Sequence, residues 1–431
     1  HDQRSAYTHP APLLCHAFAR RWNQHRNTQR FIGPSIHRNH DGIFACMPIR
    51  KSKIIQSAGY LICKMRTATE VAAAIELLGD EVEKSGLHVH QLKTLRAIQH
   101  CRTAALGGHV DACTSCGTVH ISYNSCRNRH CPKCQGHRRV QWIQKREEEL
   151  LPAVYYHVVF TLPSELNPLC LHQPKLVYDT LFESAWQTLQ KFGGQKQLRL
   201  GMICILHTWG QNLSLHPHLH CIVPGAGIDA KGNWQKIHAT DKFLFPVKAM
   251  SKIFRAKYVN NLRKQKYNDK ALIETLFKKD WVVYAKKPFG NPSSVIEYLG
   301  RYTHKVAISN QRIQSVTEDG VIFQYKDYKQ QGIKKEMRLS LPEFVRRFAM
   351  HILPHRFVRI RHYGFLSSTW KRKKLKDLQQ RLGVTIQPKE PQTRLHKCPA
   401  CKTGTMITIE VFGKRGPPAK YLLVTENIAC N

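Results

Sequence analysis

The chain has 431 residues, and its 67 Lys and Arg against 29 Asp and Glu give a formal charge of +38 before its 25 histidines are considered. So many positive charges repel one another unless a polyanion is near. The charge therefore argues against an ordinary small-molecule enzyme and favours nucleic acid or an anionic membrane surface as partner. With 42% hydrophobic residues, the chain can bury cores and is not a disordered basic tail. Its most apolar windows, such as 153–162, are shorter than the about 18–20 residues of a spanning helix, so we expect no integral membrane protein.

Residues 1–64 differ from the rest of the chain. They carry ten Lys or Arg, two acidic residues and six His, without a helical or strand period. We expect either a disordered basic arm or an upstream extension translated in frame, with a start near Met47 or Met65. Folded structure should begin after Thr67, which forms a capping box with Glu70 ahead of the helical apolar spacing in 71–78.

The next elements can be predicted in chain order. A helix is expected over 140–150, strands over 155–162, 202–209 and 216–223, and a further helix over 175–192. The second and third strands flank a turn at 210–212, which indicates a hairpin. This order of helices and strands predicts an α+β fold with an antiparallel sheet, rather than a doubly wound fold with a parallel sheet.

Two Cys-x-x-Cys pairs separated by fourteen residues have the spacing typical of a zinc site. Each pair presents two thiolates to one ion, and two pairs complete a closed tetrahedron. We expect one structural Zn²⁺ on Cys113, Cys116, Cys131 and Cys134, with disulfides or free thiols as the alternative. Cys126 and His130 lie between the pairs. They could hold a second ion together with Cys101 or His137, or replace one of the four ligands.

Two other features accompany these cysteines. Arg127, Arg129 and Lys133 surround the second pair, together with the cations at 138 and 139, and form a candidate phosphate-binding surface. The alternative is that these charges are only solvated. A later pair, Cys398 and Cys401, looks like half a site, whose partners could be Cys430 and an unidentified group.

Three histidines alternate at the start of the strand 216–223. Alternation places His218 and His220 on one face of the strand and the intervening Leu219 on the other. Two such imidazoles can bind one divalent ion with coordination positions left open. Satisfied structural histidines are the alternative. His216 shares this face and is our candidate third ligand, with Gln211 and Glu297 as other options.

Two tyrosines four residues apart, Tyr298 and Tyr302, would share one face of a helix. A tyrosine oxygen can attack a phosphodiester when a metal polarises the phosphoryl oxygen. The alternative is that both rings only pack against the sheet.

The combination resembles the two-tyrosine, zinc-binding rolling-circle transposases of the IS 91 type, in the HUH endonuclease superfamily. The resemblance runs collinearly from about Leu92 to Leu366 and rests on these strings: CRTAALGGH, SCRNRHCPKCQ, YYHVVFTLP, LHTWGQNLSLHPHLHCIVPG, YLGRYTHKVAISN and FVRRFAMHILPHRFVRIRHYGFL. Residues 1–64 lie outside it.

The resemblance implies a metal site at His218 and His220 and nucleophiles at Tyr298 and Tyr302. It further implies Mg²⁺- or Mn²⁺-dependent nicking of single-stranded DNA at transposon ends, a 5′-phosphotyrosine link and strand transfer, without a nucleotide cofactor. Location in the cytoplasm at the bacterial nucleoid follows. A replication initiator or relaxase and a non-catalytic zinc-dependent DNA-binding protein remain as alternatives, and the oligomeric state is not predicted.

The segment from Phe344 to Lys376 contains ten Lys or Arg, no acidic residue and several aromatics. Cations interleaved with aromatics suit single-stranded DNA, because bases stack while phosphates pair. We expect DNA contacts from Arg346, Arg347, Arg359 and Arg361. The predicted organisation is an extension over 1–64, a helical lead-in and zinc domain over 65–145, an HUH catalytic domain over 150–340, a basic segment over 341–380 and a tail over 381–431.

Overall fold

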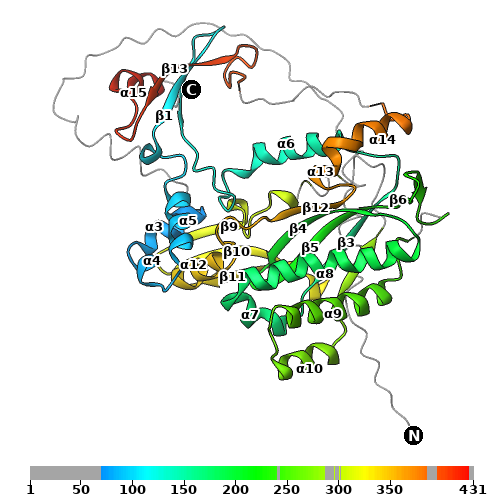
Figure 1. Ribbon diagram of the computed structural model, residues 1–431. Coiled ribbons are helices and arrows are strands. Elements are labelled where there is room, and N and C mark those ends of the chain that lie inside the picture. Colours follow the sequence, from blue (N-terminus) through cyan, green and yellow to red (C-terminus); the bar gives the residue numbers. More distant parts are fainter. Residues whose placement is uncertain are drawn as a thin grey trace, which may run out of the picture.

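A computed structural model describes residues 69–239, 243–286, 296, 300, 302–385 and 396–426. These described residues form three larger antiparallel units and one short two-stranded hairpin, which Figure 1 shows in one view. The α+β expectation is confirmed. The expected extension 1–64, Thr67, Glu297 and Tyr298 lie outside the described residues. Within the described residues, no helix combines the length and apolar character needed to cross a bilayer.

The largest unit is a five-stranded sheet in the order β12-β4-β5-β3-β8. Its strands are β3 (Tyr155–Thr161), β4 (Gly201–Trp209), β5 (Leu215–Pro224), β8 (Val283–Lys286) and β12 (Ile360–Gly364). The hairpin β4–β5 and the strand β3 match the predicted elements. All nine residues of β4 are buried, because helices pack on both faces of the sheet.

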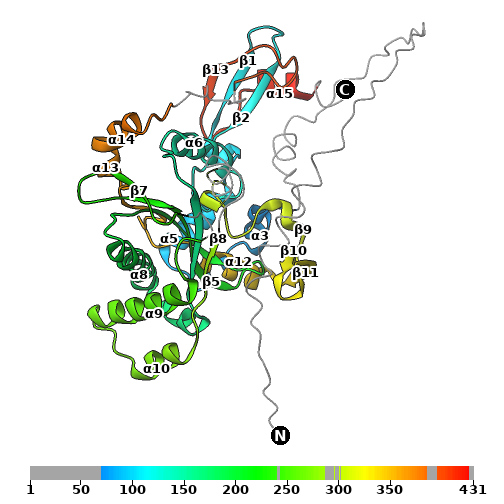
Figure 2. The same ribbon diagram turned by 90° about the vertical axis from the view of Figure 1, so that its right-hand side faces the viewer.

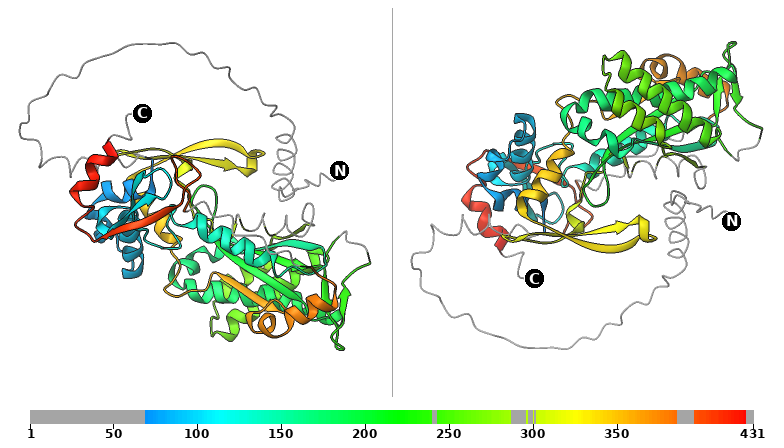
Figure 3. Two further views of the ribbon diagram at one scale, coloured as in Figure 1. Left: turned by 90° about the horizontal axis from the view of Figure 1, so that it is seen from above. Right: turned by 90° about the horizontal axis from the view of Figure 1, so that it is seen from below.

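Helices α7 (Asn167–His172), α8 (Pro174–Gln195), α9 (Val247–Lys264) and α10 (Lys270–Lys278) cover the first face. Figure 3 shows α8 and α9 against this face from below. The opposite face carries α6 (Gln135–Glu147), α13 (Ser368–Trp370) and α14 (Lys376–Arg381), and a short hairpin, β6 (Ala226–Ile228) and β7 (Trp234–Lys236), extends from one end. Helix α6 begins five residues before the predicted 140, directly after Cys134.

A second unit packs helices on a three-stranded sheet, β9 (Ile313–Thr317), β10 (Gly320–Asp327) and β11 (Ile333–Leu339). Its helices are α3 (Val71–Leu78), α4 (Glu81–Lys84), α5 (Val89–Gln99) and α12 (Leu341–Met350). One buried cluster joins α3, α5 and α12 to this sheet. The predicted lead-in at 65–145 therefore shares its core with residues about 220 to 280 positions later in the chain.

The third unit, here named the cysteine ribbon, consists of β1 (Gly108–Cys113), β2 (Val119–Tyr123), β13 (Met406–Phe412) and α15 (Ala419–Glu426). It stands apart from the five-stranded sheet in Figure 2. Strand β13 pairs with β1 over its length, from Gly108 opposite Phe412 to Cys113 opposite Met406. The expectation of a tail over 381–431 is therefore wrong for residues 396–426, because β1 offers a strand edge that they complete.

Candidate functional site

Three imidazoles lie close together near the turn of the β4–β5 hairpin, and we name them the histidine cluster. His207 on β4 lies directly opposite His218 on β5, and His220 follows two positions along the same face. One ring nitrogen from each of the three lies within 4.8 Å of the others. His218 and His220 thus meet as predicted, but His207, not His216, is the third member. The exposed His216 lies beside His218 and outside the cluster.

Sequence reasoning missed His207, although the hairpin prediction contained the signal. A short turn at 210–214 makes residues on the two strands pair directly, and this register places His207 beside His218. Of the other candidates for the third ligand, Gln211 lies in the turn, where its carbonyl accepts a hydrogen bond from Arg312.

The outward nitrogen of each ring in the cluster has a hydrogen-bond partner. Nε2 of His207 donates to the carbonyl of Tyr302 at 2.7 Å, and Nδ1 of His218 donates to the carbonyl of His216 at 2.6 Å. Nδ1 of His220 lies 2.8 Å from Nε2 of His157 on β3. Metal-binding histidines in proteins are oriented in this way, with the second nitrogen bonded to a carbonyl or another polar group.

Burial keeps these imidazoles neutral. It lowers the pKa of His218 to about 3 and holds the pKa values of His207 and His220 well below their usual range. A neutral imidazole has the lone pair that a metal requires. The donor set and its outer hydrogen bonds therefore fit a divalent cation with open coordination positions.

Tyr302 lies against the histidine cluster. Its ring centroid is 4.3 Å from that of His220 and 5.8 Å from that of His207. Nζ of Lys305 lies 5.5 Å from the Tyr302 ring centroid, and burial lowers the pKa of this lysine. Tyr302 and Thr303 are helical, as the spacing predicts. The partner tyrosine, Tyr298, lies outside the described residues, so their shared face stays a prediction.

Two sets of contacts hold the segment that carries Tyr302. Arg359 donates to the carbonyls of Thr303 and, at 3.2 Å, of Lys305. Ile143 of α6 packs so closely on Gly300 that a Cβ there would lie 2.3 Å from an Ile143 carbon. Burial lowers the pKa of Arg359 to about 10. The predicted DNA contact of Arg359 is therefore wrong, since its donors bind the protein backbone.

Most of the other predicted DNA-binding cations also have protein partners. Arg129 donates to the carbonyls of Pro354 and Phe357, Lys133 pairs with Glu70 at 2.5 Å, Arg346 and Arg347 both pair with Glu343, and Arg361 pairs with Asp179 over the ring of Phe182. Arg129, Lys133 and Arg361 thereby join segments that are far apart in the chain. The pairs of Arg346 and Arg347 with Glu343 lie within α12. Arg127 is exposed, with a left-handed φ of 52°.

A different pair of cations lies near the tyrosine. Arg138 and Arg139 are exposed on α6. Burial lowers the pKa of His304 to about 4, and the positive charges of Arg359, Arg138 and Arg139 lower it further. Because His304 is two residues from Tyr302, both exposed arginines lie near the segment that carries the tyrosine.

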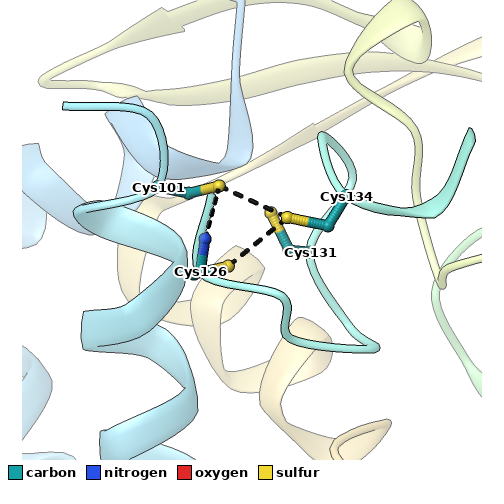
Figure 4. A group of neighbouring side chains, drawn as sticks. All are labelled: Cys101, Cys126, Cys131 and Cys134. Carbon is teal, nitrogen blue, oxygen red and sulfur yellow. Dashed lines mark hydrogen bonds between the residues drawn. The ribbon is translucent and has the colours of Figure 1, made fainter. Parts of the chain in front are cut away.

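The cysteines form two groups rather than the predicted one. The core cysteine site brings together Cys101, Cys126, Cys131 and Cys134, whose sulfurs lie within 4.8 Å of one another (Figure 4). Sγ of Cys134 is 3.5 Å from that of Cys101 and 3.6 Å from that of Cys126. The site lies against the buried cluster of the second unit. Cys126 and Cys101 thus take the two places expected for the first pair.

The first pair belongs to the other group. Cys113 and Cys116 meet Cys398 and Cys401, again with all four sulfurs within 4.8 Å. Grouping the first pair with Cys131 and Cys134 is wrong, because β1 carries Cys113 into the cysteine ribbon. His130 joins neither group. Its Nε2 accepts from the amide of Leu353 at 3.4 Å, and the side chain is buried.

Comparison with known proteins agrees with this geometry. Residues 201–374 match a family model described as "Putative transposase", and residues 75–162 match one described as "Transposase zinc-binding domain". The chain is 41% identical to "Putative transposase y4qJ" of Sinorhizobium fredii (strain NBRC 101917 / NGR234), over 82% of this chain and 98% of that protein. It is 29% identical to "Transposase for insertion sequence element IS801" of Pseudomonas savastanoi pv. phaseolicola, over 67% of this chain and 73% of that protein.

No solved structure matches the chain. The first family model spans β4, β5 and Tyr302, which form the candidate site, and the second contains the whole core cysteine site. The chain belongs to the transposases of the IS 91 type, with a zinc-binding domain N-terminal to the transposase core.

Proposed function

We propose that the chain nicks single-stranded DNA at the ends of its insertion sequence through a tyrosine nucleophile and then transfers the strand. The position of Tyr302 carries this proposal, because its ring lies against the three imidazoles of the histidine cluster. A phenol beside a cation site is the arrangement that attack on a phosphodiester requires.

The reaction balances as two transesterifications. The tyrosine oxygen forms a bond to phosphorus, the bond from phosphorus to the 3′ oxygen breaks, and the phenolic proton is lost while the 3′ oxygen gains one. In strand transfer, a 3′-hydroxyl attacks the same phosphorus and the tyrosine leaves. Each step exchanges one ester for another, so no nucleotide cofactor is needed. Tyr298 is the proposed second nucleophile, on its spacing from Tyr302 alone.

A divalent cation on His207, His218 and His220 would polarise the phosphoryl oxygen under attack. Three imidazoles suit Mn²⁺ better than Mg²⁺, which prefers oxygen ligands. The chain's own groups do the remaining work. Lys305 places a positive charge beside the Tyr302 ring, which favours loss of the phenolic proton. Arg359 holds the backbone on both sides of His304.

The proposed path of the strand crosses the face of the sheet that carries α6 and α14. These helices pack together, and Gln379 of α14 donates to the carbonyl of Glu148 at 2.9 Å. The exposed cations of α6 and of the segment 371–376 include Arg138, Arg139, Arg372, Lys373 and Lys374. Exposed cations on these segments suit the phosphate backbone of single-stranded DNA, which in this proposal is that of the transposon ends in the bacterial nucleoid.

We assign the structural Zn²⁺ of the zinc-binding domain to the core cysteine site. Cys134 immediately precedes α6, and the same helix carries Arg138, Arg139 and Ile143. Zinc at the start of α6 would therefore position both the arginines and the residue that packs on Gly300.

The test is a nicking assay on labelled single-stranded transposon-end oligonucleotides, with Mn²⁺ and Mg²⁺ in separate titrations. We expect a covalent protein–DNA adduct from the wild type and none from the double variant Tyr298→Phe/Tyr302→Phe. Half-maximal nicking should need at least about ten times less Mn²⁺ than Mg²⁺. An adduct from the double variant would refute the nucleophile assignment. A wild type that binds these oligonucleotides but forms no adduct would favour the non-catalytic alternative.

A further inference from the structure

We propose that Cys113, Cys116, Cys398 and Cys401 bind a second Zn²⁺, which joins two segments that are far apart in the sequence. We name these residues the clasp cysteines. Their sulfurs lie within 4.8 Å of one another, although up to 288 positions separate them in the sequence. The proposal goes beyond the nicking function and does not depend on it.

The sulfur positions have the dimensions of a tetrahedral zinc site. Sγ of Cys113 lies 3.7 Å from Sγ of Cys401, and Sγ of Cys116 lies 3.7 Å from Sγ of Cys398. Zinc–sulfur bonds of about 2.3 Å in a tetrahedron place the sulfurs about 3.8 Å apart. A disulfide needs about 2.05 Å between sulfurs, so the spacing is that of ligands around one ion.

Backbone amides on both sides point at these sulfurs. The amides of Ser115 and Cys116 approach Sγ of Cys113 at 3.4 and 3.5 Å, and the amide of Gly404 approaches Sγ of Cys401 at 3.3 Å. Amide–sulfur hydrogen bonds stabilise the negative charge of thiolates, which is the form that binds a metal. Both halves of the site are therefore built for thiolates rather than for neutral thiols.

The two Cys-x-x-Cys turns have the same backbone hydrogen bond. The amide of Gly117 donates to the carbonyl of Cys113 at 3.1 Å, and the amide of Lys402 donates to the carbonyl of Cys398 at 3.0 Å. Equivalent turns can present their sulfurs to one ion in the same way. The three strands of the cysteine ribbon with two such turns have the parts of a zinc ribbon.

The backbone fits tightly around the sulfurs. A Cβ at position 404 would lie 2.3 Å from Sγ of Cys113, so only glycine allows this approach. The two turns are also joined directly, since the amide of Thr114 donates to the carbonyl of Thr405 at 3.0 Å. These contacts hold the second turn against the first at the distance that a shared ion requires.

The cysteine ribbon needs such an ion because it has little core. None of the three buried apolar clusters in the described part of the chain includes a residue of β1, β2 or β13. Alternate residues Ile407, Ile409 and Val411 of β13 are exposed. Small units of this kind depend on a metal for their folding energy. We therefore expect zinc at the clasp to hold 396–426 on β1.

The test counts thiolate-bound metal in the full-length protein under reducing conditions. Co²⁺ replaces zinc, and its sulfur charge-transfer absorbance per chain is measured, because histidine-bound Co²⁺ does not contribute to that band. The absorbance of Cys398→Ser/Cys401→Ser should be half that of wild type, as should that of Cys101→Ser/Cys134→Ser. His396→Ala, an exposed neighbour outside the group, is the matched control and should keep the full absorbance.

Two further outcomes decide the assignment. Full absorbance in Cys398→Ser/Cys401→Ser would overturn the clasp, because the remaining cysteines would then bind all the metal. A double variant Cys113→Ser/Cys398→Ser should also retain half, since both residues belong to one site. If it retains none, each residue serves a different ion, and the clasp is refuted. Limited proteolysis should release a C-terminal fragment that contains β13 from the Cys398→Ser/Cys401→Ser variant and not from the wild type.

Discussion

The histidine cluster and the clasp cysteines are both suited to hold a cation, but the chain builds them in opposite ways. His207, His218 and His220 come from one hairpin, and a sheet with a buried core positions them. Cys113 and Cys398 come from distant segments of a ribbon that is not part of the buried clusters. The five-stranded sheet therefore positions the histidine cluster without a metal ion. The cysteine ribbon, by contrast, is expected to need its metal ion in order to fold.

The sharpest test of this contrast is removal of a cluster histidine. His207→Ala should lower the rate of nicking more than about 100-fold, because it removes a direct ligand, whose loss costs more than that of an outer hydrogen-bond partner. The matched control His216→Ala should stay within about threefold, since the exposed His216 lies outside the cluster. Single-turnover nicking at saturating Mn²⁺ measures both, and circular dichroism should show an intact fold. Equal losses in both variants would restore His216 as the third ligand.

A smaller effect on nicking is expected from a change at His157, which shares a hydrogen bond with His220. When His220 binds a cation through Nε2, its Nδ1 must donate to Nε2 of His157. His157→Leu removes this acceptor and should weaken Mn²⁺ binding about 10- to 100-fold. The rate at saturating Mn²⁺ should recover, which distinguishes a positioning role from a direct one. His157→Gln keeps an acceptor and should lose less. An Mn²⁺ titration of nicking measures the shift, and an unchanged midpoint for His157→Leu would contradict the role.

Thermal unfolding should separate the core cysteine site from the clasp. Cys134→Ser should lower the midpoint of the main transition by about 10 °C or more, because this site adjoins the buried cluster of the second unit. Cys401→Ser should shift that midpoint by no more than about 2 °C, since the ribbon lies outside the cores. Calorimetry of both variants is the measurement. A large shift from Cys401→Ser would mean that the ribbon stabilises the whole molecule.

The smallest expected effect concerns the exposed arginines of α6. Arg138→Ala/Arg139→Ala should weaken single-stranded DNA binding several-fold and reduce the slope of log affinity against log salt by about 1.4, at about 0.7 per phosphate contact. Lys248→Ala/Lys252→Ala removes two exposed cations from α9, on the other face of the sheet, and is the control. Fluorescence anisotropy across a salt series measures both slopes. Equal slopes for the two variants would place the DNA elsewhere.

The sequence by itself determined the parts of the molecule that rest on local patterns. Apolar runs on either side of a turn predicted β3, β4 and β5, and the alternation within 216–223 placed His218 and His220 on one face. Helical spacing likewise predicted that Tyr302 is helical, and the short turn predicted an antiparallel hairpin. These inferences succeeded because side-chain direction within a strand or helix depends on the backbone of a few neighbouring residues.

Only the tertiary structure decided which distant groups meet. His207 required the register between β4 and β5, and one residue of slip would turn its side chain to the other face. The pairing of Cys113 with Cys401 required β13 to add to β1. Its charge made Arg359 a candidate DNA contact, but in the fold its guanidinium donates to the carbonyls of Thr303 and Lys305. The residues around a cysteine or a cation in the sequence do not predict its partner, because a thiolate or guanidinium group binds any suitable ion or carbonyl that the fold brings close to it.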